Sequence, residues 1–150
     1  MKAFNELKLP LRIVGRGVEF KNLQKIAGPT IEFTGRVSDK ELQKIYSEAQ
    51  AFIFPQEEDF GIVAIEALAS GRPIVAYRAG DVEEHIEDRK SGIFFEKQTK
   101  DDIIKAVKKF QKIKFNPEYI RQQSLRFAKE KFKKEIKNIV ESEYNTIFNL

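Results

Sequence analysis

The chain has 150 residues, of which 41% are hydrophobic and 33% are charged, and its formal net charge is +4. This composition is typical of one globular domain with its own hydrophobic core. Because there is no cysteine and a single histidine, disulfides and thiolate metal sites are excluded, and we expect no zinc or iron site. No apolar run approaches the roughly 20 residues that a membrane-spanning helix needs, and the first residues do not resemble a secretory signal. We therefore expect a cytoplasmic protein.

Short apolar runs alternate with helical patterns along the first 115 residues. In chain order we predict helical turn Lys2–Leu7, strand Leu11–Val14, helix Glu19–Ala27, strand Ile31–Phe33, helix Asp39–Ala49, strand Ala51–Phe54, helix Ile62–Ser70, strand Ile74–Tyr77, helix Val82–Asp88 and strand Ile93–Phe95. The strands lack polar–apolar alternation, which indicates a parallel sheet that is covered on both faces. The sequence therefore predicts an α/β fold with a doubly wound parallel sheet and right-handed crossovers.

Two helix starts in this region are well marked. Ser38 and Glu41 form a capping box, in which Ser38 caps the helix and Glu41 reaches back. Thr99 precedes two acids, which favour the positive end of a helix that we expect to run to about Lys112.

The C-terminal region is predicted to be helical. Asn116 before Pro117 provides a cap followed by proline at the first helical position, and the helical pattern then continues to Asn149 with a break near residues 130–133. We therefore divide the chain into an α/β domain, residues 1–115, and C-terminal helices, residues 116–150, that pack on it; an exposed apolar face or dimerisation are the alternatives. Since a doubly wound domain normally begins with a strand, we expect a further strand and most of a helix upstream of residue 1.

Charge is distributed unevenly along the chain. Lys and Arg are concentrated after Lys97, whereas residues 56–71 carry four acids and no base. The Lys-rich region is typical of a solvated helical face, and it also suits peripheral attachment to an anionic surface, such as the inner face of a membrane, or a phosphorylated partner. We expect no nucleic-acid partner.

The segment from Glu58 to Glu66 carries the strongest indication of function. Glu66 is the only charge between Phe60 and Ala69, in a helix that is apolar around almost its whole circumference. Such a helix is normally buried, and a buried carboxylate requires a partner. The residues alone leave open whether the protein or a ligand supplies that partner.

The start of this helix suits an anionic ligand. Pro55 marks the carboxyl edge of the sheet, the polar loop 56–59 follows, and Gly61 lets a ligand approach the backbone closely. The first amides lack intrahelical acceptors and lie at the positive end of the helix dipole, so the position is suited to a phosphate. Glu58 and Glu66 add carboxylate oxygens that can accept hydrogen bonds from sugar and ribose hydroxyls.

Several segments occur in a specific order. They are Arg-Ile-Val-Gly-Arg-Gly (12–17), Ile-Glu-Phe-Thr-Gly-Arg-Val (31–37), Glu-Leu-Gln-Lys-Ile-Tyr (41–46), Ala-Phe-Ile-Phe-Pro (51–55), the Glu-x7-Glu motif (58–66) and Glu-Ala-Leu-Ala-Ser-Gly-Arg-Pro-Ile-Val (66–75). Through them, residues 11–95 resemble the C-terminal, nucleotide-sugar-binding domain of family 4 glycosyltransferases. These are retaining enzymes of the GT-B architecture, so the resemblance implies one Rossmann-like half of a GT-B fold.

The resemblance implies a function and roles for individual residues. The family moves a sugar from a nucleoside diphosphate sugar, here a UDP- or GDP-sugar, to an acceptor hydroxyl in polysaccharide, glycan or lipid-linked glycan synthesis, without a cofactor or metal. Glu58, the candidate catalytic residue, is expected to face the transferred sugar, and Glu66 the ribose. The candidate donor-binding residues are Arg36, Val37, Glu58, Phe60, Gly61, Ile62 and Glu66.

Some positions have two interpretations or depart from the pattern of the resembled family. In the turn after the second strand, Val37 is the expected nucleobase contact, whereas Arg36 is either a second contact or a solvated residue. Asp81 and Glu83 add negative charge near the expected diphosphate, which argues against their loop as a close ligand contact. His85 is predicted to be a surface residue. The family's Arg and Lys that grip the diphosphate, and its N-terminal acceptor domain, correspond to sequence upstream of residue 1.

We therefore expect the donor-binding half of a glycosyltransferase that, as this chain alone, binds nucleotide weakly at best and is inactive. A dinucleotide-binding module is one alternative, because Gly15-Arg16-Gly17 follows the first strand, but Phe20 stands where the third glycine belongs. A non-catalytic Rossmann-like nucleotide-binding or interaction module is the other, and the two intact carboxylates argue against it.

Overall fold

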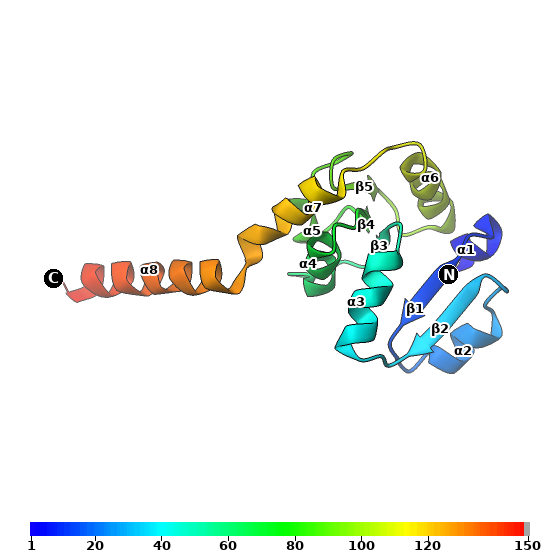
Figure 1. The fold of residues 1–150 in the computed structure, drawn as a ribbon, viewed down its shortest axis with the longest axis horizontal. Helices are drawn as coiled ribbons and strands as arrows, with labels where there is room; N and C mark the ends of the chain where they lie inside the picture. The colour runs from blue at the N-terminus through cyan, green and yellow to red at the C-terminus, as the bar shows by residue number, and fades with distance from the viewer. Residues whose placement is uncertain (149–150) are drawn as a thin grey trace.

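The structure, a computed structural model, describes residues 1–148. Its elements in chain order are α1 (Lys2–Leu7), β1 (Leu11–Val14), α2 (Phe20–Lys25), β2 (Ile31–Gly35), α3 (Asp39–Glu48), β3 (Phe52–Phe54), α4 (Ile62–Ala69), β4 (Ile74–Tyr77), α5 (Val82–His85), β5 (Gly92–Phe95), α6 (Lys100–Phe110), α7 (Pro117–Ser124), the 3₁₀ helix η1 (Leu125–Phe127) and α8 (Lys129–Phe148) (Figure 1).

Every pair of strands within residues 1–148 is parallel, which confirms the predicted α/β class. β1 pairs with β2, so that Leu11 lies opposite Ile31, and β4 lies between β3 and β5, with Ile74 opposite both Phe52 and Gly92. The hydrogen bonds nevertheless connect the strands in two groups, β1–β2 and β3–β4–β5, rather than in the one continuous sheet that the sequence suggested.

Helices cover both faces of the larger group of strands. Side chains alternate between the faces along β3: Phe54 packs in a cluster with Tyr46 of α3 and Leu68 of α4, whereas Ile53 faces a cluster that contains Ala106 of α6. Burial on both faces explains why these strands are apolar throughout. The sheet is therefore doubly wound, as predicted.

An apolar cluster beneath α1 and α6 links the two groups of strands. Phe4 of α1 and Val107 of α6 pack there with Leu11 of β1 and Ile53 of β3, and Figure 1 shows α1 beside α6, with β1 and β2 set apart from the other strands. Within residues 1–148, β1 pairs with no strand besides β2, and β3 with none besides β4. Each of these two strands therefore has an unpaired edge.

The predicted helix starts are confirmed. The amide of Glu41 donates to the Ser38 hydroxyl at 3.3 Å and the amide of Ser38 donates to the Glu41 carboxylate at 2.8 Å. Thr99 caps α6 through the amide of Asp102, and Asn116 caps α7. These caps fix where the helices begin, because they satisfy amides that no intrahelical carbonyl can reach.

The C-terminal helices behave differently from one another. α7 lies against α4 and buries Ile120 completely. After η1, Ala128 adopts an extended conformation (φ −61°, ψ 139°), so the break precedes Lys129 instead of falling at residues 130–133. α8 then extends away from the domain (Figure 1) and buries none of its residues. The expectation that residues 116–150 pack on the domain thus holds for α7 but not for α8; Asn149 lies outside the described residues.

Candidate functional site

α4 begins at a turn that leaves backbone donors available. Gly61 is its N-cap with φ 68° and ψ 52°, a left-handed conformation that favours glycine. The Gly61 carbonyl accepts the amide of Ala64 at 2.8 Å, whereas the amides of Gly61, Ile62 and Val63 have no acceptor within residues 1–148. Three free donors at the positive end of an eight-residue helix form a favourable place for an anion.

The loop that carries Glu58 is held by the loop after β4. The Asp81 amide donates to the Glu58 carbonyl at 3.3 Å. Gly80 (φ 71°) lies so close that a Cβ atom there would be 2.5 Å from the same carbonyl oxygen. The Gln56 side-chain amide donates to the Glu58 carboxylate, which is otherwise at the surface. The loop after β4 therefore contacts the Glu-x7-Glu motif through its backbone, and it sets the position of Glu58.

Glu66 is exposed, so the expectation that α4 is buried on every side is wrong. One face of α4 packs Ala64, Ala67 and Leu68 into the core, while the opposite face leaves Ile62 63% exposed and places Glu66 at the surface. Of the ion pairs in the described part of the chain, none involves Glu66. The carboxylate is thus not neutralised internally and faces solvent from an apolar helix surface.

Tyr46 of α3 holds the Glu66 carboxylate. Its hydroxyl lies 3.3 Å from Glu66 Oε2 and 3.2 Å from the Val63 carbonyl oxygen, and it can donate its one hydrogen to either acceptor. Burial, together with the nearby Glu66 charge, raises the pKa of Tyr46 well above its ordinary value. The phenol is therefore neutral at physiological pH and acts as a donor that orients Glu66.

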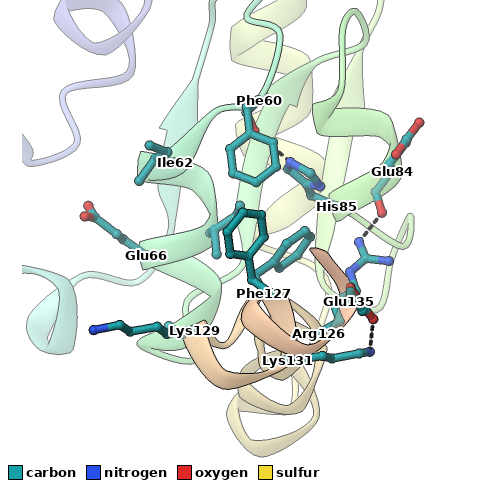
Figure 2. A pocket seen from close by; sticks show the side chains of 13 residues that line it. Phe60, Ile62, Glu66, Glu84, His85, Arg126, Phe127, Lys129, Lys131 and Glu135 are labelled. Carbon is teal, nitrogen blue, oxygen red and sulfur yellow. Dashed lines mark hydrogen bonds and ion pairs between the residues drawn. The ribbon is translucent and has the colours of Figure 1, made fainter. Parts of the chain in front are cut away.

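An open cavity of about 770 Å³ lies beside the exposed face of α4. Its walls come from α4, α5, η1 and the start of α8, and its lining residues are Phe60, Ile62, Ile65, Glu66, Ala69, Glu84, His85, Arg126, Phe127, Lys129, Lys131, Phe132 and Glu135. In Figure 2 Glu66 and Lys129 point to the same side, away from the rings of Phe60 and Phe127. The cavity joins apolar surface to charges of both signs, next to the free amides of α4.

His85 is buried, which corrects its prediction as a surface residue. Its side chain is 4% exposed, and its Nε2 lies 2.7 Å from the Phe60 carbonyl oxygen. The Phe60 and Phe127 rings pack against the imidazole edge to face (Figure 2), with centroids 5.5 Å and 4.8 Å away. A single histidine after an acidic loop gives no sequence signal of burial, because its covering residue Phe127 lies 42 positions further along the chain.

The structure brings together most, but not all, of the predicted site residues. Glu58, Phe60, Gly61, Ile62 and Glu66 lie on the loop after β3 and the first turns of α4. Arg36, which is exposed, and Val37, which is half-buried, lie between β2 and α3, next to the other group of strands. All follow the carboxyl ends of parallel strands, the edge at which open α/β sheets bind ligands.

One site residue, Tyr46, was not found from the sequence, and one alternative that the sequence offered loses support. Tyr46 lies four residues after Leu42 on the buried face of α3, so its spacing indicates a core residue rather than a partner of Glu66. Gly15, considered as part of a dinucleotide fingerprint, instead donates its amide to the Gly35 carbonyl at 2.7 Å. This leaves one fewer backbone donor for a phosphate at the β1 end.

Residues 1–148 contain no cluster of three or more His, Cys, Asp or Glu side chains arranged to hold a metal ion. None of their helices has both the length and the hydropathy that crossing a bilayer would need.

Comparisons with known proteins agree with this architecture. The chain is 33% identical over 105 residues to the sulfoquinovosyl transferase SQD2 of Arabidopsis thaliana, and the match covers 65% of the chain and 21% of that protein. It is 40% identical over 84 residues to a GDP-mannose-dependent alpha-mannosyltransferase of Mycobacterium tuberculosis, covering 55% of the chain and 22% of that protein. The chain thus spans about a fifth of the length of these two relatives.

Solved structures show the same fold. The lipopolysaccharide outer core galactosyltransferase WaaB superposes with a TM-score of 0.80 at 16% identity, over 94% of this chain and 44% of that one. The pneumococcal O-GlcNAc transferase GtfA, solved with UDP and GlcNAc, superposes with a TM-score of 0.73 at 24% identity, over 94% of this chain and 31% of that one. The fold is the Rossmann-like half of a GT-B glycosyltransferase. Residues 1–138 match the family model "Glycosyl transferases group 1", and the chain therefore belongs to the group 1 glycosyltransferases.

Proposed function

We propose that this chain is the donor-binding half of a retaining glycosyltransferase that moves a sugar from a nucleoside diphosphate sugar to an acceptor hydroxyl. The observation that carries the proposal is the start of α4, where three free amides lie between the exposed carboxylates of Glu58 and Glu66. This arrangement offers donors for phosphate and acceptors for hydroxyls within one loop and helix.

The diphosphate is assigned to the amino end of α4. The amides of Gly61 and Ile62 provide hydrogen bonds, and the helix dipole adds partial positive charge. When the bond from the anomeric carbon to the diphosphate oxygen breaks and the bond to the acceptor oxygen forms, negative charge develops on the leaving nucleoside diphosphate. Donors that are already aimed at that charge stabilise the transition state more than the ground state. The proton of the acceptor hydroxyl passes to an oxygen of the leaving diphosphate, which becomes more basic as its bond to the sugar breaks.

The two carboxylates are assigned to the hydroxyl groups of the donor. Glu58 lies in the loop before α4 and accepts hydrogen bonds from the transferred sugar, which makes it the candidate catalytic residue. Glu66 lies one turn into α4, is oriented by Tyr46, and accepts the ribose hydroxyls through two oxygens. Val37, with Arg36 beside it, is assigned to the nucleobase because the loop after β2 opens at the same edge of the sheet. No metal or cofactor is part of this assignment.

The acceptor side of the reaction is assigned to another domain. The unpaired edges of β1 and β3, which share one apolar cluster, support a further strand of the polypeptide between them. Relatives that are several times longer than this chain support an acceptor domain beyond it. We therefore expect the isolated chain to bind nucleotide weakly and to transfer no sugar.

Titration of the ¹⁵N-labelled chain with UDP- and GDP-sugars tests the proposal, because NMR detects millimolar affinities. We expect one of the two nucleotide classes to shift the amide signals of Gly61 and Ile62. The Glu66→Gln variant should lose this response, whereas Glu135→Gln, which removes a different acid from the same cavity, should keep it. Equal responses in both variants, or shifts confined to residues away from α4, would contradict the assignment.

A further inference from the structure

His85 is a buried polar residue in an aromatic environment, and one of its two ring nitrogens has no hydrogen-bond partner within residues 1–148. It is the last residue of α5, it is 4% exposed, and it packs among the rings of Phe60 and Phe127. The imidazole nitrogen Nδ1 is fully buried and has no hydrogen-bond partner within residues 1–148, so the polar side chain carries an unfavourable desolvation cost.

The contact that uses the imidazole is at its other nitrogen. Nε2 lies 2.7 Å from the carbonyl oxygen of Phe60. A carbonyl oxygen only accepts hydrogen bonds, so Nε2 carries the hydrogen. Nδ1, which has no hydrogen-bond partner among the described residues, takes no part in this contact.

This hydrogen bond acts on the peptide unit that starts α4. The Phe60 carbonyl and the Gly61 amide belong to the same peptide bond, which is planar, and all peptide bonds in residues 1–148 are trans. In a trans peptide the carbonyl and the N–H point in opposite directions. Fixing the carbonyl towards His85 therefore aims the Gly61 N–H away from the core, on the side where no protein acceptor meets it.

The surrounding rings hold the imidazole itself in place. Phe60 and Phe127 pack against each other at 6.0 Å and 87°, and each packs edge to face on His85. The Arg126 guanidinium also donates to the Glu84 carbonyl, which ties η1 to α5 (Figure 2). The loop, α5 and η1 thus form one packed unit around a single buried hydrogen bond.

We propose that His85 is a positioning residue of the donor site, which orients the Phe60–Gly61 peptide so that the Gly61 amide points at the donor's diphosphate. The identity of the ligand rests on the proposed function. The orientation of the Phe60–Gly61 peptide by His85 does not, because it follows from the hydrogen bond alone. The inference assigns a role to His85, which lies outside the Glu-x7-Glu motif and does not touch the donor. Loss of the hydrogen bond leaves the peptide free to rotate, because glycine tolerates other conformations.

The test uses two substitutions with different consequences. His85→Phe keeps an aromatic ring of similar size but removes the donor, whereas His85→Gln keeps an N–H donor at a similar distance from the backbone. Phe127→Leu serves as the packing control, because it removes ring contacts with His85 and leaves the hydrogen bond to Phe60. Circular dichroism and melting temperature establish that each variant is folded.

Two readouts do not depend on any ligand. The chain has one histidine, so the ¹⁵N signals of its imidazole need no assignment and report the tautomer directly; we expect hydrogen on Nε2. We also expect the Gly61 amide signal to shift and broaden in His85→Phe and to remain near its wild-type position in His85→Gln and Phe127→Leu. A wild-type imidazole without hydrogen on Nε2 would overturn the inference, and so would an unchanged Gly61 signal in a folded His85→Phe variant. Neither result depends on nucleotide binding, and the first does not depend on any variant.

The third readout is the affinity for the nucleotide sugar that the wild type binds. His85→Phe should weaken it by about tenfold, as expected for one lost backbone hydrogen bond to a charged group, and His85→Gln should restore most of it. Equal affinities in the wild type and His85→Phe would overturn the positioning role. If the wild type binds no nucleotide sugar while the tautomer and the Gly61 shift are as expected, the proposed function fails and the structural part of the inference stands.

Discussion

Substitution of Gly80 by alanine should displace Glu58, because the new side chain collides with the Glu58 backbone. Gly80 has φ 71°, which costs a non-glycine residue roughly 1–2 kcal/mol. In addition, the new Cβ would lie 2.5 Å from the Glu58 carbonyl oxygen, and the two atoms must separate by about 0.9 Å to reach the 3.4 Å at which ordinary contact begins. Strain and overpacking together should lower the free energy of unfolding by about 2–5 kcal/mol.

Gly15→Ala is the matched control for this substitution. Gly15 also has a positive φ, 102°, but a Cβ there meets nothing within 4 Å. It should therefore show a conformational cost of about 1–3 kcal/mol without a collision. The difference between the two variants reports the collision with Glu58.

Urea unfolding and NMR titration measure the two effects separately. We expect Gly80→Ala to be the less stable variant, to shift the amide signals of Glu58 and Phe60, and to bind the nucleotide sugar about tenfold more weakly or worse, since a misplacement near 1 Å disrupts a preorganised site. Gly15→Ala should keep the wild-type affinity. Equal stabilities and equal affinities in the two variants would refute the argument that Gly80 sets the position of Glu58.

Three further substitutions or deletions probe other parts of the structure. Tyr46→Phe removes the hydroxyl that lies 3.3 Å from Glu66, and a loss of about 0.5–1.5 kcal/mol should appear as severalfold weaker nucleotide binding in calorimetry; unchanged binding would show that Glu66 needs no orienting group. The hydrogen bond from Tyr119 lowers the pKa of Glu87, and Lys90 adds to this shift. The ionised Glu87 therefore stabilises the fold above the ordinary carboxyl pKa, and this stabilisation is lost as the pH falls through the lowered pKa. An NMR pH titration should therefore find a higher Glu87 pKa in Tyr119→Phe, and an unchanged value would exclude that bond as the cause. Deletion of residues 129–150 should leave the free energy of unfolding within about 0.5 kcal/mol of the wild-type value, because no residue of α8 is buried; a large loss in urea unfolding would mean that α8 packs on the domain in solution.

Local patterns predicted much of the fold. The capping residues Ser38, Thr99 and Asn116 fixed the starts of α3, α6 and α7 to the residue, because a cap satisfies amides within its own segment. The apolar runs also identified all five strands in the described part of the chain, since strands that are covered on both faces must be apolar throughout. These signals are contained in a few consecutive residues.

Features that depend on distant contacts could not be predicted in this way. The apolar circumference of α4 predicted burial on all sides, yet the tertiary structure covers only the face of Ala64, Ala67 and Leu68 and leaves Glu66 exposed. Likewise, the burial of His85 depends on Phe127, and the direction of α8 depends on the extended backbone of Ala128. Alanine is common within helices, so Ala128 does not indicate a helix break. The sequence also does not indicate that Phe127 packs on His85, because the two residues are far apart along the chain.

The candidate site shows the same division. The carboxylates and Gly61 were identified from their spacing in one segment, because the loop and the first turns of a helix are continuous in sequence. Tyr46 and Gly80, which hold those residues in place, come from segments that only the folded sheet brings next to them. Their types, a core tyrosine and a turn glycine, are common in any α/β domain.

A crystal structure of the chain with bound UDP or GDP would test the donor assignment most directly. We predict that the diphosphate oxygens lie within hydrogen-bond distance of the Gly61 and Ile62 amides and that the ribose hydroxyls contact the Glu66 carboxylate. A nucleotide bound elsewhere on the domain, with the start of α4 and Glu66 facing only solvent, would contradict the assignment.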